Sequence, residues 1–290
     1  MSLRIALIGK TGQLARAILH EAEDLGYQVT ALDRTYLDLS ISADKIEPAI
    51  FDFLVEFDVL ILAAAYTNVD GAETDTTTAH AVNAIAPHAI ARACERRSIP
   101  MIHISTDYVF GGNSKTPYKP NDETNPLGVY GASKLAGEIA VLKTNARVLI
   151  LRTSWVFDGT GRNFLTTMLR LSETHETLSV VNDQVGRPTF AGDLARATIR
   201  AAEAIFQDKN IKSRVYHVTN VGAPISWAEF AVKIFQVTNR DVVVKEIPSS
   251  EYPTPVERPA FSVLDTMSFE NDFEYNLPDW QSGLKRALEF

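Results

Sequence analysis

The first half of the chain alternates short apolar runs with longer amphipathic segments. The runs have the length and β-branched character of strands, and the segments carry apolar residues at helical spacing. Strands are expected at 4–9, 28–33, 58–65, 100–105 and 147–152, and helices at 13–26, 42–57, 76–97 and 128–143. This alternation predicts an α/β fold, a doubly wound parallel sheet of the Rossmann type with right-handed crossovers.

The second half has a more mixed pattern. Helices are expected at 163–173, 191–206, 226–238 and 279–290, and strands at 178–183, 215–219 and 241–248. We therefore predict a dinucleotide-binding domain over residues 1–156, whose sheet is completed by parts of 190–221. A smaller mixed α/β substrate lobe is expected from residues 157–189 and 222–290.

The composition favours a globular protein and argues against several kinds of binding partner. The 290 residues are 46% hydrophobic and 22% charged, which is typical of a globular chain. The net charge of −8 disfavours a nucleic-acid partner. The single cysteine, Cys94, cannot form an internal disulfide, and the six histidines show no ligand-like clustering, so no metal is predicted. Without a membrane-length apolar run or a secretory-type N-terminus, we expect a cytoplasmic protein that does not enter a membrane.

A glycine-containing loop follows the first expected strand. Gly9, Gly12 and Ala15 form the pattern G-x-x-G-x-x-A, a variant of the dinucleotide fingerprint. Gly9 allows a tight turn, and Gly12 allows the backbone to approach a pyrophosphate at the start of the next helix. Ala15 stands where a third glycine would permit close packing, so a slight change in spacing is expected there.

The end of the second expected strand carries opposing signals for the cofactor. Asp33 lies about 20 residues beyond the fingerprint, where a carboxylate accepts hydrogen bonds from an adenosine ribose and favours NADH. Arg34 suits a 2′-phosphate and favours NADPH. Asp38 and Leu39 are expected to reach the adenine from the following loop. The sequence therefore leaves both NADH and NADPH as possible cofactors.

The fourth expected strand and the next helix supply polar groups at one edge of the sheet. Thr106 directly follows the strand, and Tyr130 and Lys134 lie four residues apart on the helix, so they share one face. A tyrosine with its ordinary pKa near 10 is a poor acid–base group at neutral pH, but a nearby ammonium lowers that pKa. The spacing predicts a proton-transfer site beside a bound dinucleotide.

These residues carry a family resemblance that runs nearly from end to end. The tyrosine–lysine pair in "YGASK" resembles the extended short-chain dehydrogenase/reductases. The narrower segments "STDYVF", "RTSWVF" and "NDQVGRPT" resemble the dTDP-4-dehydrorhamnose reductase family within them. The resemblance implies reduction of dTDP-4-dehydro-6-deoxy-L-mannose to dTDP-L-rhamnose by NADPH or NADH.

The resemblance also implies roles for individual residues. Tyr130 would protonate the C4 oxygen of the sugar, Lys134 would lower the pKa of Tyr130 and hold the nicotinamide ribose, and Thr106 would orient the ketone. Asn83 would organise the helix that carries the tyrosine. The remaining cofactor contacts would be Lys10, Thr11, Gln13 and Leu14 in the phosphate loop, and Ala63, Ala64, Ala65 and Tyr66 after the third strand.

Contacts to the nucleotide sugar are implied for a further set of residues. Beside the sugar would lie Val69, Asp107 and Trp155, and in the later lobe Asn163, Arg187 and Arg258. Arginine suits a diphosphate because its guanidinium donates two parallel hydrogen bonds. A homodimer is also expected.

Two alternatives remain open from the sequence. One is another sugar-nucleotide epimerase or reductase of the extended family, acting on a different hexose. The other is a non-catalytic regulatory subunit of the methionine adenosyltransferase β type, which resembles this reductase but acts by binding a partner enzyme. Intact Thr106, Tyr130 and Lys134 favour catalysis over the second alternative.

Overall fold

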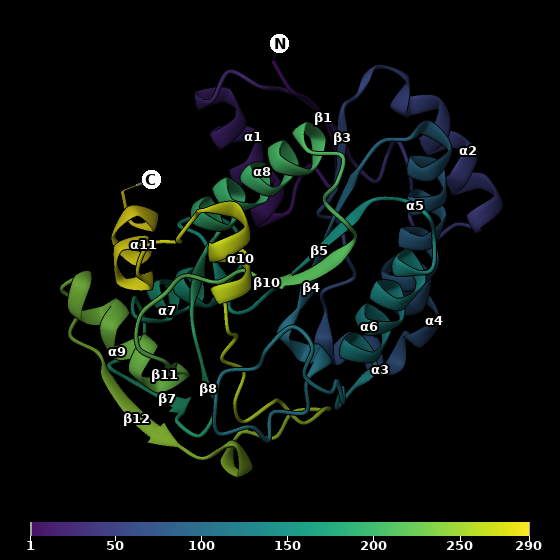
Figure 1. Cartoon of the computed structure of the whole chain (residues 1–290). Coiled ribbons are helices and arrows are strands. Elements are labelled where there is room, and N and C mark those ends of the chain that lie inside the picture. Colours follow the sequence, from purple (N-terminus) through teal and green to yellow (C-terminus); the bar gives the residue numbers. More distant parts are fainter. Residues whose placement is uncertain (1, 290) are drawn as a thin grey trace.

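A computed structural model describes residues 2–289 of the chain (Figure 1). Its centre is a six-stranded sheet with the order β2-β1-β3-β4-β5-β10, in which every pairing is parallel. The strands are β1 (Arg4–Ile8), β2 (Gln28–Leu32), β3 (Val59–Leu62), β4 (Met101–Thr106), β5 (Val148–Thr153) and β10 (Arg214–His217).

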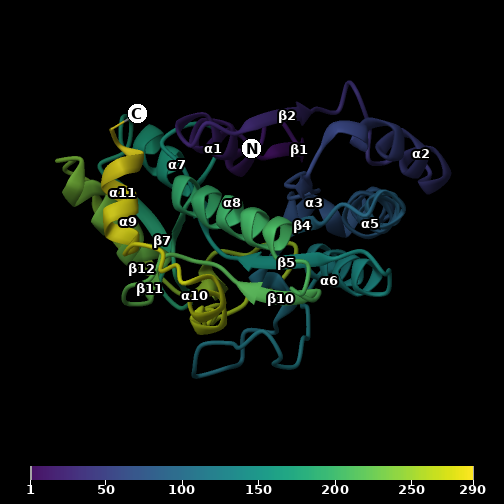
Figure 2. The same ribbon diagram turned by 45° about the horizontal axis from the view of Figure 1, so that its top comes forward.

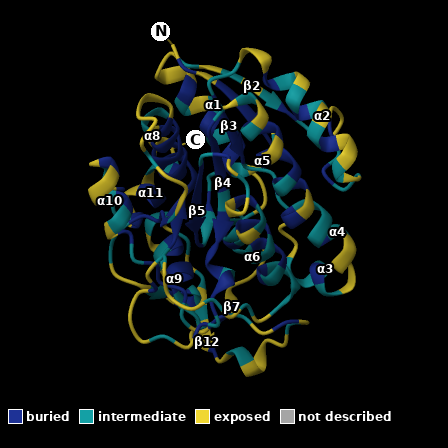
Figure 3. Ribbon diagram, turned by 45° about the vertical axis from the view of Figure 1, so that its right-hand side comes forward, coloured by how far each residue is buried: buried dark blue, intermediate teal, exposed yellow. Residues whose placement is uncertain are grey.

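Helices cover both faces of this sheet (Figures 1 and 2). One face packs against α1 (Gln13–Asp24) and α8 (Ala191–Gln207), and the other against α2 (Ala43–Phe53), α5 (Ala86–Arg97) and α6 (Val129–Leu142). Every residue of β3 and β5 is buried (Figure 3), as expected of parallel strands covered on both sides. The predicted doubly wound α/β fold is confirmed.

The strand order fixes where a ligand can bind. The chain leaves β1 for β2 on one side and later returns to place β3 on the other side. Loops after β1 and β3 therefore diverge and leave a crevice at the carboxyl edge of the sheet.

The helix expected at 76–97 is interrupted in the structure. A helical turn α4 (Thr76–His80) leads into a π-helical turn at Ala81–Ile85, and α5 begins at Ala86. Pro87 lacks the N–H that would bond the carbonyl of Asn83 four residues earlier, so a regular α-helix cannot continue there. This carbonyl instead faces Gly137 of α6, where an added Cβ would lie only 2.0 Å from it.

Two short helices were not expected from the sequence. The helix α3 (Val69–Thr74) follows β3, and α10 (Met267–Phe273) lies near the C-terminus. Phe269 and Phe273 of α10 pack on Tyr216 of β10, so this helix belongs to the core of the main sheet.

The remaining elements form a second core beside the sheet. Phe157, Phe190, Phe230 and Trp280 are buried together in it. Its elements are β6 (Val156–Phe157), β7 (Thr177–Val181), β8 (Val185–Gly186), β9 (Thr189–Phe190), β11 (Ile225–Ser226), β12 (Val243–Ile247), α7 (Phe164–Leu171), α9 (Trp227–Val237) and α11 (Trp280–Ala287). A domain boundary at residue 156 stays a prediction. Over residues 2–289, no helix combines the length and apolarity required to cross a membrane.

The close contact between α6 and the π-helical turn gives a test of the fold. We expect Gly137→Ala to lower the free energy of unfolding by about 1 to 3 kcal/mol, because backbone atoms must shift to admit the methyl group. Urea denaturation measures this change. Ala140→Ser, at a partly exposed position of the same helix, is the control. Equal midpoints for Gly137→Ala and the parent protein would contradict the packing described.

Candidate functional site

A cavity of about 1030 Å³ lies at the carboxyl edge of the sheet. Its walls come from the loops after β1, β2, β3, β4 and β5, together with the start of α6. It therefore occupies the crevice that the strand order predicts. Every cofactor residue expected from the sequence lines it, as do Val69, Thr106, Asp107 and Trp155.

The phosphate loop has the geometry of a dinucleotide site. Gly9 has a φ of +108°, and a Cβ there would lie 2.8 Å from the backbone nitrogen of Ala64. At Gly12, just before α1, a Cβ would meet nothing within 4 Å, so the backbone is open to the cavity. The first N–H groups of α1 lack partners within the helix and favour an anion. The residues present thus fit the diphosphate of a dinucleotide.

The loop after β2 holds its charged groups in local contacts. Asp33 accepts hydrogen bonds from the backbone and hydroxyl of Thr35 at 2.9 and 2.5 Å, and these bonds lower its pKa. Arg34 donates to Asp38 from Nε and Nη2 at 3.1 and 3.0 Å. Arg34 is therefore already paired with a carboxylate, which would repel a 2′-phosphate bound to the same guanidinium.

The edge after β3 is anchored by a buried asparagine. Asn83, in the π-helical turn, accepts from the backbone N–H of Tyr66 and donates to the Tyr66 carbonyl at 2.9 and 3.0 Å. Its amide also donates to the hydroxyl of Ser133 on α6 at 3.0 Å. These bonds join the cofactor edge to the helix of Tyr130, in agreement with the role expected for Asn83.

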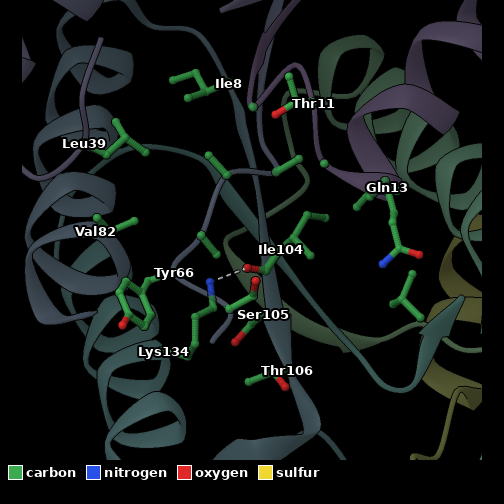
Figure 4. Close-up of a pocket in the computed structure, with 18 of the residues that line it drawn as sticks. Ile8, Thr11, Gln13, Leu39, Tyr66, Val82, Ile104, Ser105, Thr106 and Lys134 are labelled. Carbon is green, nitrogen blue, oxygen red and sulfur yellow. Dashed lines mark hydrogen bonds between the residues drawn. The ribbon is translucent and has the colours of Figure 1, made fainter. Parts of the chain in front are cut away.

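Three polar side chains meet at the end of β4. Thr106 ends this strand, and Tyr130 and Lys134 face it from α6, so all three line the cavity. Figure 4 shows the amino group of Lys134 donating to the carbonyl oxygen of Ile104, a bond of 2.7 Å. Gly131 allows α6 to approach the chain, because a Cβ there would lie 2.2 Å from the carbonyl oxygen of Tyr108.

Burial dominates the protonation of these groups. It raises the pKa of Tyr130 to about 12 and lowers the pKa of Lys134 to about 8, where the carboxylate of Glu138 acts in the opposite direction. Desolvation is the largest effect on the pKa of Tyr130, and a hydrogen bond with the side chain of Thr106 acts in the opposite direction. The ammonium of Lys134 donates to the carbonyl of Ile104, and the lowering of the Tyr130 pKa that we expected from it stays a prediction. The phenol therefore keeps its proton throughout the neutral range.

A stacked pair of indoles forms another wall of the cavity. Trp155 lies after β5 with a φ of +49°, and its ring stacks on Trp227 with centroids 3.5 Å apart. On Gly186 a Cβ would lie 2.4 Å from the Trp155 ring, so only glycine fits there. Trp155 is thus held in a fixed orientation.

Three residues expected to bind substrate do not line this cavity. Asn163 caps α7, where it accepts from the backbone of Thr166 and donates to the Asp158 carbonyl. Its amide is therefore used within its own loop. Arg187 donates to the Leu264 carbonyl at 3.3 Å, and Arg258 pairs with Asp70 at 2.7 Å. Substrate roles for Asn163 and the two arginines remain predictions.

Several residues that line the cavity were not predicted from the sequence. Trp227 has the pattern of a core residue on an amphipathic helix, and no spacing in the chain connects it to Trp155. Arg16 and Arg162 also line the cavity, and Arg16 is held by Asp158 and Thr160. Arg16 could have been predicted, because it is a cationic residue close to the phosphate loop in sequence. Arg162 is far from that loop in sequence, so no pattern pointed to it. Among residues 2–289, no group of three or more His, Cys, Asp or Glu could hold a metal ion.

Known proteins share this architecture over their whole length. Residues 3–290 match the family model described as RmlD substrate binding domain. A dTDP-4-dehydrorhamnose reductase of Aggregatibacter actinomycetemcomitans is 40% identical, with 99% of each chain covered. The crystal structure of the Clostridium acetobutylicum dTDP-4-dehydrorhamnose reductase is 35% identical, covers 99% of each chain and has a TM-score of 0.90.

A second solved structure adds a bound cofactor. The Bacillus anthracis dTDP-4-dehydrorhamnose reductase, in complex with NADP, is 32% identical and superposes with a TM-score of 0.90, covering 100% of this chain and 99% of its own. The α/β fold and the cavity at the carboxyl edge of the sheet agree with the similarity to these reductases over the full length of the chain. The chain belongs to the dTDP-4-dehydrorhamnose reductase family.

Proposed function

We propose that this protein reduces dTDP-4-dehydro-6-deoxy-L-mannose to dTDP-L-rhamnose with NADH or NADPH. The observation that carries the proposal is a half-buried, protonated Tyr130 beside Thr106 and Lys134, at the sheet edge that bears the phosphate loop. Full-length similarity to reductases of this name supports the choice of substrate. An NADP complex of one of them supports the cofactor.

The residues of the chain divide the work of reducing a ketone. The bound nicotinamide supplies the hydride that adds to C4 of the sugar. Tyr130 gives its hydroxyl proton to the C4 oxygen, so that the ketone becomes an alcohol and the phenol becomes a phenolate. Thr106 hydrogen bonds the same oxygen and fixes the carbonyl. Lys134, positively charged below its pKa of about 8, stabilises the negative charge that remains on Tyr130.

The finer assignments belong to the same proposal. Val69, Asp107 and Trp155 flank the hexose, and Arg187 and Arg258 contribute to diphosphate binding after a local rearrangement. The substrate lobe comprises 157–189 and 222–290, apart from α10, which packs on β10 of the main sheet. We also propose that the protein works in the cytoplasm as a homodimer without a nucleic-acid partner.

A direct assay separates the candidate activities. Purified protein is mixed with dTDP-4-dehydro-6-deoxy-L-mannose and NADPH or NADH, and the nicotinamide absorbance is followed. A reductase consumes one reduced cofactor for each alcohol formed. An epimerase converts the sugar without net oxidation, and a regulatory subunit leaves both compounds unchanged. Either of these two results would reject the proposal.

The acid role of Tyr130 can be tested separately. We expect Tyr130→Phe to keep the Kd for NADPH and to lower kcat by roughly 100- to 10,000-fold, because only the donated hydroxyl is lost. Tyr118→Phe is the control, since Tyr118 is a buried tyrosine that stacks on Phe110 and does not line the cavity. Turnover of Tyr130→Phe within a few-fold of the parent would mean that another group donates the proton.

Cofactor preference follows from the Arg34–Asp38 pair. We expect Asp38→Asn to tighten NADPH binding by about two- to fivefold with little effect on NADH, because it releases Arg34 and removes a carboxylate that repels the 2′-phosphate. The asparagine can still accept from the backbone of Ser40. Arg34→Ala should weaken NADPH alone. Equal shifts for the two cofactors in both variants, measured by fluorescence titration, would exclude this pair as the determinant.

A further inference from the structure

The hydroxyl of Thr106 has one hydrogen, and in the structure the carboxylate of Asp107 accepts it. Oγ1 of Thr106 accepts from the backbone N–H of Tyr108 at 3.2 Å and donates to Oδ1 of Asp107 at 3.0 Å. A hydroxyl has one donor and two acceptor positions. While it donates to Asp107, Thr106 can therefore offer the cavity only a lone pair. A ketone oxygen needs a donor.

The carboxyl group of Asp107 is shielded from solvent. The residue is 3% exposed, and among residues 2–289 no hydrogen-bond partner is found for its buried Oδ2. Its surroundings are Ser262, Tyr108 and Tyr130, while Arg258 and Asp70 lie beyond Tyr108. Burial raises the pKa of Asp107 to about 7, although hydrogen bonds from Thr106 and Ser262 act in the opposite direction. Both protonation states are therefore accessible near neutral pH.

We propose that Asp107 is a positioning residue that sets the direction of the Thr106 hydrogen, an inference that rests on the proposed reductase activity. When Asp107 is ionised, it accepts the hydrogen of Thr106. When Asp107 is protonated, its O–H donates to Oγ1 of Thr106, which also accepts from Tyr108. Thr106 then has both acceptor positions filled and turns its hydrogen toward the ketone oxygen.

The protonated state favours reduction for an electrostatic reason. Negative charge develops on the C4 oxygen as hydride arrives, and two donors, Tyr130 and Thr106, then stabilise it. Only hydrogen bonds reorient between Asp107 and Thr106, and no proton leaves this pair. The proton consumed in each turnover still comes from Tyr130. Asp107 also lines the cavity, so this positioning role adds to the place beside the hexose that is proposed for it above.

The sign of the pH dependence follows from this arrangement. Asp107 carries its proton below its pKa of about 7 and loses it above, so Thr106 becomes a poorer donor as the pH rises. We expect kcat/KM for ketone reduction to fall by up to about tenfold between about pH 6 and about pH 8. The pKa of Lys134, about 8, contributes at the upper end of this range and must be separated from the effect of Asp107.

Asp107→Asn provides that separation. The amide N–H can donate to Oγ1 of Thr106 at every pH, so kcat/KM of this variant, taken relative to its own value near pH 6, should lose most of the decline toward pH 8. Lys134 titrates in both proteins, so the difference between the two profiles isolates Asp107. Asp75→Asn is the matched control, because Asp75 lines the same cavity but accepts a hydrogen bond from Thr78 on α4. Its profile should follow that of the parent.

A double variant tests whether Asp107 acts through Thr106. Thr106→Val removes the hydroxyl, and adding Asp107→Asn to it should change neither kcat nor the pH profile further. An Asp107→Asn profile that declines like that of the parent would overturn the inference, as would a raised KM for the sugar at every pH with an unchanged decline. If the parent protein shows no reduction at all, the proposed function itself fails. If the parent reduces the ketone, these outcomes bear on Asp107 alone.

Discussion

A buried ion pair between Glu138 and Arg152 joins the helix of Tyr130 to the sheet. Arg152 on β5 donates to both carboxylate oxygens of Glu138 on α6, with a shortest distance of 2.6 Å, and Ser105 on β4 donates to the same group at 2.5 Å. Both charged side chains are less than 5% exposed. Such a pair contributes little net stability, but losing one partner leaves a buried charge that costs about 3 to 5 kcal/mol. It therefore fixes α6 in one register on β4 and β5.

The reacting groups depend on that register. Tyr130, Lys134 and Glu138 succeed one another at four-residue intervals, so fixing Glu138 also fixes the two residues above it on the same face. Burial also determines the protonation states of Tyr130 and Lys134. Desolvation opposes charge on Tyr130 and on Lys134 alike, and the carboxylate of Glu138 partly restores the charge of the lysine. A neutral phenol and a charged ammonium can thus coexist below about pH 8, which is the state that reduction of a ketone requires.

Much of this site could be predicted from the sequence, because the residues that line it directly follow the strands of a parallel sheet. Strand ends are local in sequence, and parallel pairing brings them to one edge, so Gly9, Ala64 and Thr106 could be placed together before the structure was known. Contacts between residues that are distant in the chain leave no pattern from which they could be predicted. The amide of Asn163, for example, is used by the loop that it caps, and its substrate role stays a prediction. The hydrogen bond of Lys134 to Ile104 and the stacking of Trp227 on Trp155 depend on tertiary packing, which residue spacing in the sequence does not reveal.

The wall formed by Trp155 shows how the two cores act on one cavity. Trp155 follows a strand of the main sheet, whereas Trp227 and Gly186 belong to α9 and β8 of the second core. A left-handed backbone at a tryptophan is unfavourable and persists only where its surroundings hold it. The second core supplies those surroundings by packing a ring on one side and a glycine on the other. The position of this wall relative to Tyr130 is therefore set jointly by both cores. A shift of the second core would change the shape of the cavity at Trp155, while the phosphate loop, which belongs to the main sheet, stayed in place.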